Sequence, residues 1–140
     1  DGKVDIFVAG VGTGGTISGV GKVLKEHDPS IHILAVEPDT SPVLSGGQPG
    51  AHQLAGLGAG FVPKTYNPSV VDEILPVSSE EAFARSRALA TQEGLLLGRA
   101  ARAALHAARR LARRKEMADK TIVVLLPDGA EKYMSTALFT

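Results

Sequence analysis

Residues 4–19 read VDIFVAGVGTGGTISG, an apolar run that leads through several glycines into a segment with helical spacing. The run from Val4 to Ala9 lacks polar alternation, which is typical of a strand buried on both faces of a sheet. The segment from Gly15 to His27 repeats apolar residues every three or four positions, at Ile17, Val20, Val23 and Leu24. It stops at the pair Asp28-Pro29. A strand, a tight glycine turn and a helix are therefore predicted in that order.

The rest of the chain repeats this alternation. Further strands are predicted at Ile31 to Val36, Val71 to Val77 and Thr121 to Leu126, where β-branched and apolar residues gather. The first and last of these runs also lack polar alternation. We therefore expect a largely parallel sheet that helices cover on both faces.

Two more helices are predicted from their start signals and apolar spacing. A capping box of Ser78 and Glu81 opens a helix that continues to Gly94, with one face made of Ala82, Phe83, Ser86, Leu89 and Ala90. The final helix runs from about Arg99 to Met117, and its apolar side contains Ala101, Ala104, Leu105, Ala108, Leu111 and Ala112. Its basic side contains Arg99, Arg102, His106, Arg109 and Arg113, extended by Arg110, Arg114 and Lys115. No aromatic residue interrupts this basic side, so we interpret it as a solvated helix face.

These patterns predict an α/β fold, a small doubly wound, mainly parallel four-stranded sheet with helices on both faces. The length of 140 residues is typical of one domain. The glycine- and proline-rich segment from Glu37 to Lys64 is expected to be mostly loop, and no linker divides the chain. Residues 1–140 are therefore interpreted as a single α/β domain.

Composition excludes several classes of protein. The 15 basic and 15 acidic residues cancel, so no overall field favours nucleic acid. The absence of cysteine excludes disulfides, thiolate zinc sites and a cysteine nucleophile. The longest uncharged apolar run, around Ile122 to Pro127, is too short to cross a bilayer. We expect a cytoplasmic protein that binds neither nucleic acid nor membranes.

The glycine turn is the best candidate for a binding site. Backbone N–H groups of such a turn can point to one centre, and the N-terminus of the following helix adds partial positive charge. The predicted phosphate or sulfate site consists of Gly12, Thr13, Gly14, Gly15 and Thr16. A tight turn needs some of these glycines for conformational reasons alone. No Gly-Lys-Thr or Gly-Lys-Ser follows, which excludes a nucleotide-hydrolysing P-loop, while Glu37 keeps a dinucleotide site open as an alternative.

Residues 8–19, VAGVGTGGTISG, resemble the cofactor-phosphate loop of the pyridoxal-phosphate-dependent cysteine synthases, also called O-acetylserine sulfhydrylases. The resemblance continues in the same order through residues 35–38, AVEP, 56–63, GLGAGFVP, 126–128, LPD, and 133–136, YMST. It implies a fold type II enzyme in which Gly12 to Thr16 hold the phosphate of pyridoxal phosphate. It also implies that this chain is the carboxy-terminal half. The lysine that bonds to the cofactor and the loop that holds the substrate carboxylate would then lie in an amino-terminal half outside this sequence.

The chain departs from the family pattern in three places. None of its lysines stands in the family's setting for the cofactor-bonding lysine: Lys3, Lys22, Lys25, Lys64, Lys115, Lys120 and Lys132. The family's Gly-x-Ser-Ser-Gly-Ala-Ala run, whose serine faces the cofactor ring, is replaced by residues 98–104, GRAARAA. Residues 128–131, DGAE, also differ from the family's usual sequence near the ring. We therefore expect no catalytic residue and no covalently bound cofactor in this chain.

Two hypotheses follow from the resemblance. The first is an engineered, non-catalytic domain that keeps anion binding, because Arg and Ala in residues 98–104 favour a helix over a cofactor-facing turn. The alternative is a fragment of an active cysteine synthase, converting O-acetylserine and sulfide into cysteine and acetate with a separate amino-terminal half. In either case an exposed sheet edge is expected to favour self-association.

Other combinations of polar residues are interpreted as structural. His27, Asp28 and His32 lie around a helix end and a turn without a shared face, so no metal site is predicted. Ser45, His52 and Asp39 lack the glycine-flanked serine of a hydrolase. Asp72 and Glu73 are expected to lie in solvent at the start of a strand.

Overall fold

The computed structural model describes residues 3–12, 14–50, 57–58, 60, 62, 64–82, 99–114, 116 and 119–126. Four strands and two long helices are defined there. In chain order they are β1 (Ile6–Gly10), α1 (Gly15–His27), β2 (His32–Pro38), β3 (Glu73–Val77), α3 (Arg99–Ala112) and β4 (Ile122–Val124). Two short 3-10 helices, η1 (Val43–Ser45) and η2 (Pro68–Val70), lie between β2 and β3.

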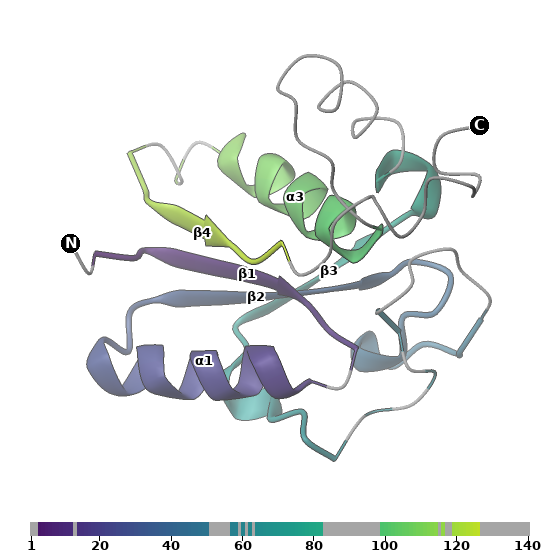
Figure 1. Ribbon diagram of the computed structural model, residues 1–140, viewed down its shortest axis with the longest axis horizontal. Coiled ribbons are helices and arrows are strands. Elements are labelled where there is room, and N and C mark those ends of the chain that lie inside the picture. Colours follow the sequence, from purple (N-terminus) through teal and green to yellow (C-terminus); the bar gives the residue numbers. More distant parts are fainter. Residues whose placement is uncertain are drawn as a thin grey trace.

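The four strands form one parallel sheet in the order β3-β2-β1-β4. In the register of the central strands, Phe7 lies opposite Ile33 on one side and Val123 on the other. Helix α1 lies on one face of the sheet and α3 on the opposite face (Figure 1). The predicted parallel, doubly wound α/β fold is confirmed, and the four predicted strands are all present within a few residues of their expected limits.

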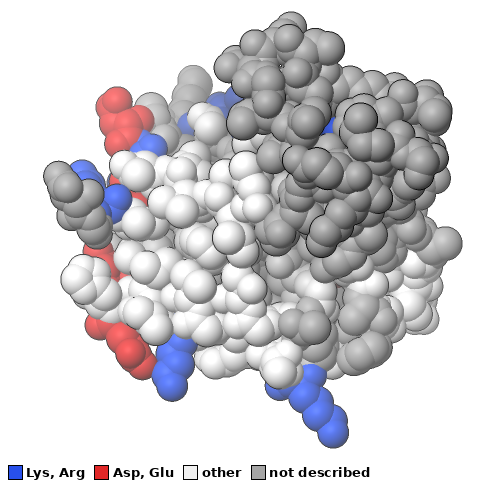
Figure 2. Space-filling model, in the orientation of Figure 1, with Lys and Arg blue, Asp and Glu red and all other residues white. Residues whose placement is uncertain are grey.

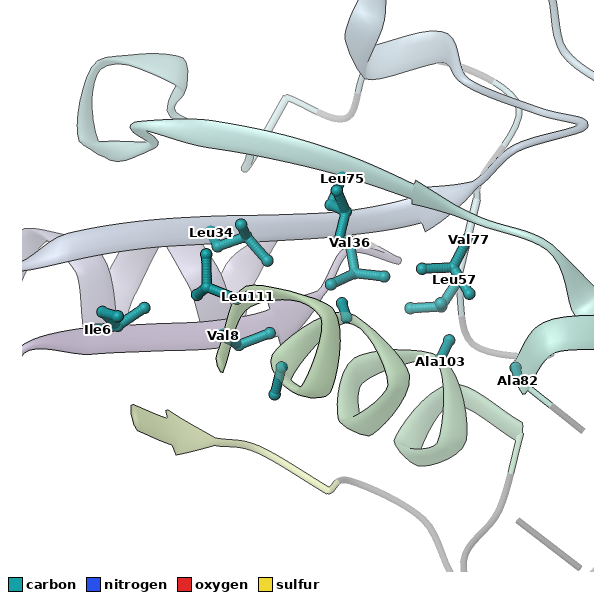
Figure 3. Close-up of a cluster of buried hydrophobic side chains, with 12 residues drawn as sticks. Ile6, Val8, Leu34, Val36, Leu57, Leu75, Val77, Ala82, Ala103 and Leu111 are labelled. Atoms are coloured by element: carbon teal, nitrogen blue, oxygen red, sulfur yellow. The ribbon is translucent and has the colours of Figure 1, made fainter. Parts of the chain in front are cut away.

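Successive residues of the central strands point to opposite faces, so each face has its own core. On the α3 side, Ile6, Val8 and Leu34 pack with Leu111 of the helix (Figure 3). On the α1 side, a second cluster contains Phe7, Ala9, Ile17, Ile33 and Ala35. Burial on both faces explains why β1 and β2 show no polar alternation.

The predicted helix starts agree with the structure. Helix α1 has the predicted limits, and at its end the N–H of Asp28 donates to the carbonyl of Leu24 at 2.8 Å. The capping box is also present, because the N–H of Glu81 donates to Oγ of Ser78 at 3.0 Å and the Glu81 carboxylate accepts the Ser78 N–H at 3.4 Å. The apolar face predicted beyond Ala82, at Phe83, Ser86, Leu89 and Ala90, lies outside the described residues.

The prediction for α1 is wrong at two positions. Ile17 is fully buried, but Val20 and Val23 are 37% and 63% exposed. The buried residues of α1 are Ile17, which packs in the core cluster below the sheet, and the small residues Ser18 and Gly21. The valines therefore belong to the outward side of the helix.

The prediction for α3 also needs correction. The helix ends at Ala112 rather than near Met117, and Arg102 is 1% exposed rather than solvated. Alanines at 103 and 107 pack against the sheet, whereas Ala101 and Leu105 form a separate buried cluster. Arg102 lies one turn before Leu105, on this second buried side.

Strand β4 differs from the other predicted buried strands. It is three residues long and lies at the edge of the sheet, where Val123 is 40% exposed. An apolar run does not distinguish a central strand from an edge strand. Among the described residues, no helix is long and apolar enough to cross a membrane.

Candidate functional site: the loop between β1 and α1

The glycine-rich loop lies at the carboxyl edge of the parallel sheet. Strand β1 ends at Gly10 and α1 begins at Gly15, on the right of Figure 1. In open parallel α/β sheets, ligands bind at this edge. Of the predicted site residues, the structure describes Gly12, Gly14, Gly15 and Thr16, and Thr13 lies outside the described residues.

Gly14 has a conformation and a contact that require glycine. Its φ of +84° is in the left-handed region, and it is the N-cap of α1. A Cβ atom there would lie 2.7 Å from Cβ and 2.8 Å from Cα of Tyr66. The side-chain hydrogen of glycine therefore lets a second segment of backbone cross the loop at this point.

The N-terminus of α1 is suited to an anion. The N–H of Ser18 donates to the carbonyl of Gly14 at 3.1 Å, and this bond begins the helical ladder of α1. The N-cap makes no side-chain hydrogen bond, and the first turn contains no acidic residue. Thr16 is exposed there. These residues fit a phosphate group, since backbone donors, the helix dipole and a hydroxyl all favour negative charge.

Glu37 does not serve a dinucleotide. Its side chain is 1% exposed at the end of β2 and accepts hydrogen bonds from the Leu44 N–H at 2.9 Å and from the Ser45 hydroxyl. Both carboxylate oxygens are thus used to hold η1 against the sheet. The alternative of a dinucleotide site that uses Glu37 is wrong for this reason. The same contact gives Ser45 a structural role.

The charged residues at the opposite edge form ion pairs. Lys25 Nζ lies 2.6 Å from Oδ2 of Asp72, which also accepts the Ile33 N–H at 2.8 Å. Arg114 and His32 both contact Glu73. Asp72 is exposed as expected, although it pairs with Lys25, whereas the expectation is wrong for Glu73, which is partly buried between Arg114 and His32. Acidic and basic side chains gather at the left of Figure 2, the side on which the strands begin in Figure 1.

These contacts change the acidity of both carboxyl groups. Burial opposes the charge of Asp72, but hydrogen bonds from Lys25 and Ile33 and the Lys25 charge lower its pKa below the ordinary value. Hydrogen bonds from Arg114 lower the pKa of Glu73 against the effect of burial, and His32 adds to the lowering. Within the described part of the chain, no three His, Cys, Asp or Glu residues gather as metal ligands would.

Comparison with known proteins identifies the family of the chain. The family described as "Pyridoxal-phosphate dependent enzyme" matches residues 1–128. The chain belongs to this family. The α/β fold of this pyridoxal-phosphate-dependent family member is also found in solved structures. O-acetylserine sulfhydrylase isoform 3 from Entamoeba histolytica superposes with a TM-score of 0.96 and 44% identity, over 99% of this chain and 41% of that chain.

Two other relatives are named as different enzymes. Cysteine synthase from Staphylococcus aureus strain Mu50 is 51% identical over 138 residues, which are 98% of this chain and 44% of the relative. The O-acetylserine-dependent cystathionine beta-synthase from Helicobacter pylori has a TM-score of 0.87 and 37% identity, over 98% of this chain and 44% of that chain. The chain thus spans less than half the length of these relatives.

Sequence reasoning did not identify every residue that shapes the loop. Tyr66 and Asn67 contact Gly14 and Ser18 from a segment far along the chain. The pair Asn67-Pro68 signals a turn, but nothing in it indicates which helix the turn will meet. The departures at residues 128–131 and the start of the 98–104 run lie outside the described side chains.

Proposed function

We propose that this chain is the phosphate-binding part of a cysteine synthase, acting with the rest of the enzyme to convert O-acetylserine and sulfide into cysteine and acetate. The observation that carries this proposal is the 51% identity to cysteine synthase over 138 residues, together with a loop whose geometry fits phosphate. Pyridoxal phosphate, when bound, supplies the electron-withdrawing ring for such a reaction. In this proposal the chain is the carboxy-terminal part, and residues 1–140 fold as one domain.

The residues proposed to hold the cofactor phosphate are Gly12, Thr13, Gly14, Gly15 and Thr16. Backbone N–H groups from the loop and from the first turn of α1 would donate to phosphate oxygens. The hydroxyls of Thr13 and Thr16 would add donors. The group that bonds covalently to the cofactor and the grip on the substrate carboxylate would come from the remainder of the enzyme.

The first hypothesis, an engineered and non-catalytic domain, gains no support from the comparisons, because the relatives are enzymes and match almost the whole chain. It rests only on residues 98–104. Of these, Arg102 has the buried position described above rather than a solubilising one. We therefore favour the enzyme fragment.

Phosphate binding can be tested on the chain itself. Titration of the ¹⁵N-labelled chain with inorganic phosphate should shift the amide signals of residues 12–16. Thr16→Val should weaken binding severalfold by removing one donor, whereas Thr121→Val, at the other edge of the sheet, should have no effect. Shifts confined to other residues would contradict the assignment.

The reaction requires a second experiment. The chain is co-expressed with the amino-terminal part of the Staphylococcus aureus cysteine synthase, and cysteine formation from O-acetylserine and sulfide is measured with pyridoxal phosphate. We expect turnover by the co-purified complex and none by either part alone. A stable complex that loads the cofactor but uses neither substrate would contradict the assigned reaction.

A further inference from the structure

Described residues of the segment that precedes β3 contact the glycine loop and the end of β1 at three points. Leu57 packs so closely over Gly10 that a Cβ there would meet its side chain at 2.2 Å. The N–H of Gly58 donates to the carbonyl of Val11 at 3.0 Å. Further along, the backbone of Tyr66 crosses Gly14. The loop is therefore held between α1 and a second segment that precedes β3.

The second half of this segment, residues 64–70, here called the strap, follows one stripe of α1. Tyr66 lies against Gly14, and the Asn67 N–H donates to Oγ of Ser18 at 2.7 Å. At Gly21 an added Cβ would be 3.0 Å from Cγ2 of Val70. Positions 14, 18 and 21 are spaced by four and three residues and thus share one helix face. Figure 1 shows η2, the end of the strap, beside α1.

The contact at Ser18 is a hydrogen bond between the backbone of the strap and a side chain in the first turns of α1. Ser18 is 9% exposed, so its hydroxyl has little access to water. The strap is itself shaped at this point, because the Asn67 side chain accepts the Ser69 N–H at 3.1 Å and its hydroxyl at 2.6 Å. The bond thus joins a rigid turn to the helix end that begins at Gly14.

We propose that Ser18 is a positioning residue for the phosphate loop, acting through the Asn67 N–H and the strap. This inference rests on the proposed phosphate site. Phosphate binding needs several N–H groups to converge on one centre, so a small displacement of the helix end weakens several bonds together. Ser18 is buried against the strap, and its bond to Asn67 limits that displacement. Its effect on the ligand is therefore indirect.

The test compares Ser18→Ala with Ser18→Thr and Ser30→Ala. Alanine removes the acceptor while raising helix propensity, so the fold should persist. Threonine keeps the hydroxyl and should restore wild-type behaviour. Ser30, whose hydroxyl bonds to Asp28 at 2.7 Å beyond the far end of α1, is the matched control. We expect phosphate to bind Ser18→Ala about three- to tenfold more weakly, with Ser18→Thr and Ser30→Ala close to wild type.

A second measurement needs no phosphate and separates this inference from the proposed function. Amide hydrogen exchange at residue 67, and at residue 18, whose N–H bonds to the Gly14 carbonyl, should accelerate severalfold in Ser18→Ala and stay unchanged in Ser30→Ala. Unchanged exchange in Ser18→Ala would overturn the positioning role even if wild type binds phosphate. A wild-type chain that binds no phosphate, with exchange altered as expected, would overturn the proposed site instead.

The wild-type chain provides a check that does not depend on any variant. Native-state exchange should show the amides of Ser18 and Asn67 opening together, at a lower free energy than the central strands β1 and β2. Opening of Asn67 independently of Ser18 would overturn the link, and so would their opening only with the whole sheet.

Discussion

Arg114 and Glu73 are joined by two parallel hydrogen bonds, from Nη1 to Oε1 at 2.9 Å and from Nη2 to Oε2 at 2.6 Å. Arg114 follows the end of α3, and Glu73 begins the edge strand β3. The same carboxylate contacts Nε2 of His32, the first residue of β2, at 3.0 Å. One acidic side chain thus connects a helix end to two neighbouring strands.

Removal of this connection should lower stability. We expect Arg114→Gln to reduce the free energy of unfolding by about 1 kcal/mol, because the pair is bidentate but about a third exposed and partly screened by solvent. Urea denaturation measures the change. Arg113→Gln, at an exposed neighbouring position, is the matched control and should differ little from wild type. Equal effects of the two substitutions would contradict a specific role for the pair.

The lowered pKa values of Asp72 and Glu73 predict loss of stability in acid. A carboxyl group with a lower pKa in the folded state stabilises the fold above its unfolded pKa, about 4, and this contribution disappears as pH falls through the folded pKa. The contribution of these two groups to the urea midpoint should therefore be constant from about pH 7 to 5 and should decrease below about pH 4. In the double variant Asp72→Asn, Glu73→Gln the fall should be shallower. Glu26→Gln, an exposed change on α1, should keep the wild-type slope.

Gly14 and Gly19 should respond in opposite ways to alanine. Gly14→Ala places a side chain at φ +84° against Tyr66, so we expect a loss of about 2 to 4 kcal/mol in unfolding free energy and no phosphate binding. At Gly19, on the same helix, an added Cβ meets nothing within 4 Å. Gly19→Ala should therefore stabilise the chain by up to about 1 kcal/mol. Thermal denaturation of both variants tests the pair.

Restoring the family's serines should not create an enzyme. The triple variant Ala100→Ser, Ala101→Ser, Arg102→Gly should show no cysteine formation in the isolated chain above the rate with free pyridoxal phosphate. Under the proposed function, the residue that bonds to the cofactor belongs to the rest of the enzyme. Stability should fall by at least about 1 kcal/mol, because glycine is a poor helix residue and Arg102 is buried. Turnover by this variant would show that a lysine of this chain supplies that function.

Self-association is predicted at β4. Val123 is 40% exposed on this edge strand, and sedimentation should show concentration-dependent association that Val123→Lys reduces. Val62 is 54% exposed and belongs to none of the strands, so Val62→Lys is the control and should leave association unchanged. A chain that stays monomeric at high concentration would contradict this prediction.

Local sequence patterns predicted the elements of this fold well. The limits of α1 and the capping box of Ser78 and Glu81 follow from residues close in sequence, and so do the four strands. Neither the exposure of Val23 nor the burial of Arg102 could be predicted in this way. Both depend on how many sides of a helix are covered, and that is decided by segments far along the chain.

The same limit applies to the candidate site. The loop from Gly12 to Thr16 was identified from its glycines and its place between a strand and a helix. The contacts of Gly14 with Tyr66 and of Ser18 with Asn67 join residues about fifty positions apart. Glu37 illustrates the opposite error, because an acidic residue at a strand end fits a ligand-binding pattern and yet is used to fix η1.

Pro76 affects which edge of the sheet can accept a further strand. It lies in the outer strand β3, where proline has no N–H to offer a further strand, and its carbonyl accepts a hydrogen bond from Nη1 of Arg110 at 3.2 Å. At this position the β3 edge therefore offers a further strand no N–H, and its carbonyl is already bonded. We therefore expect a strand from another copy, or from the rest of the enzyme, to join beside β4. It would then lie one strand away from β1, the strand that leads directly into the glycine loop.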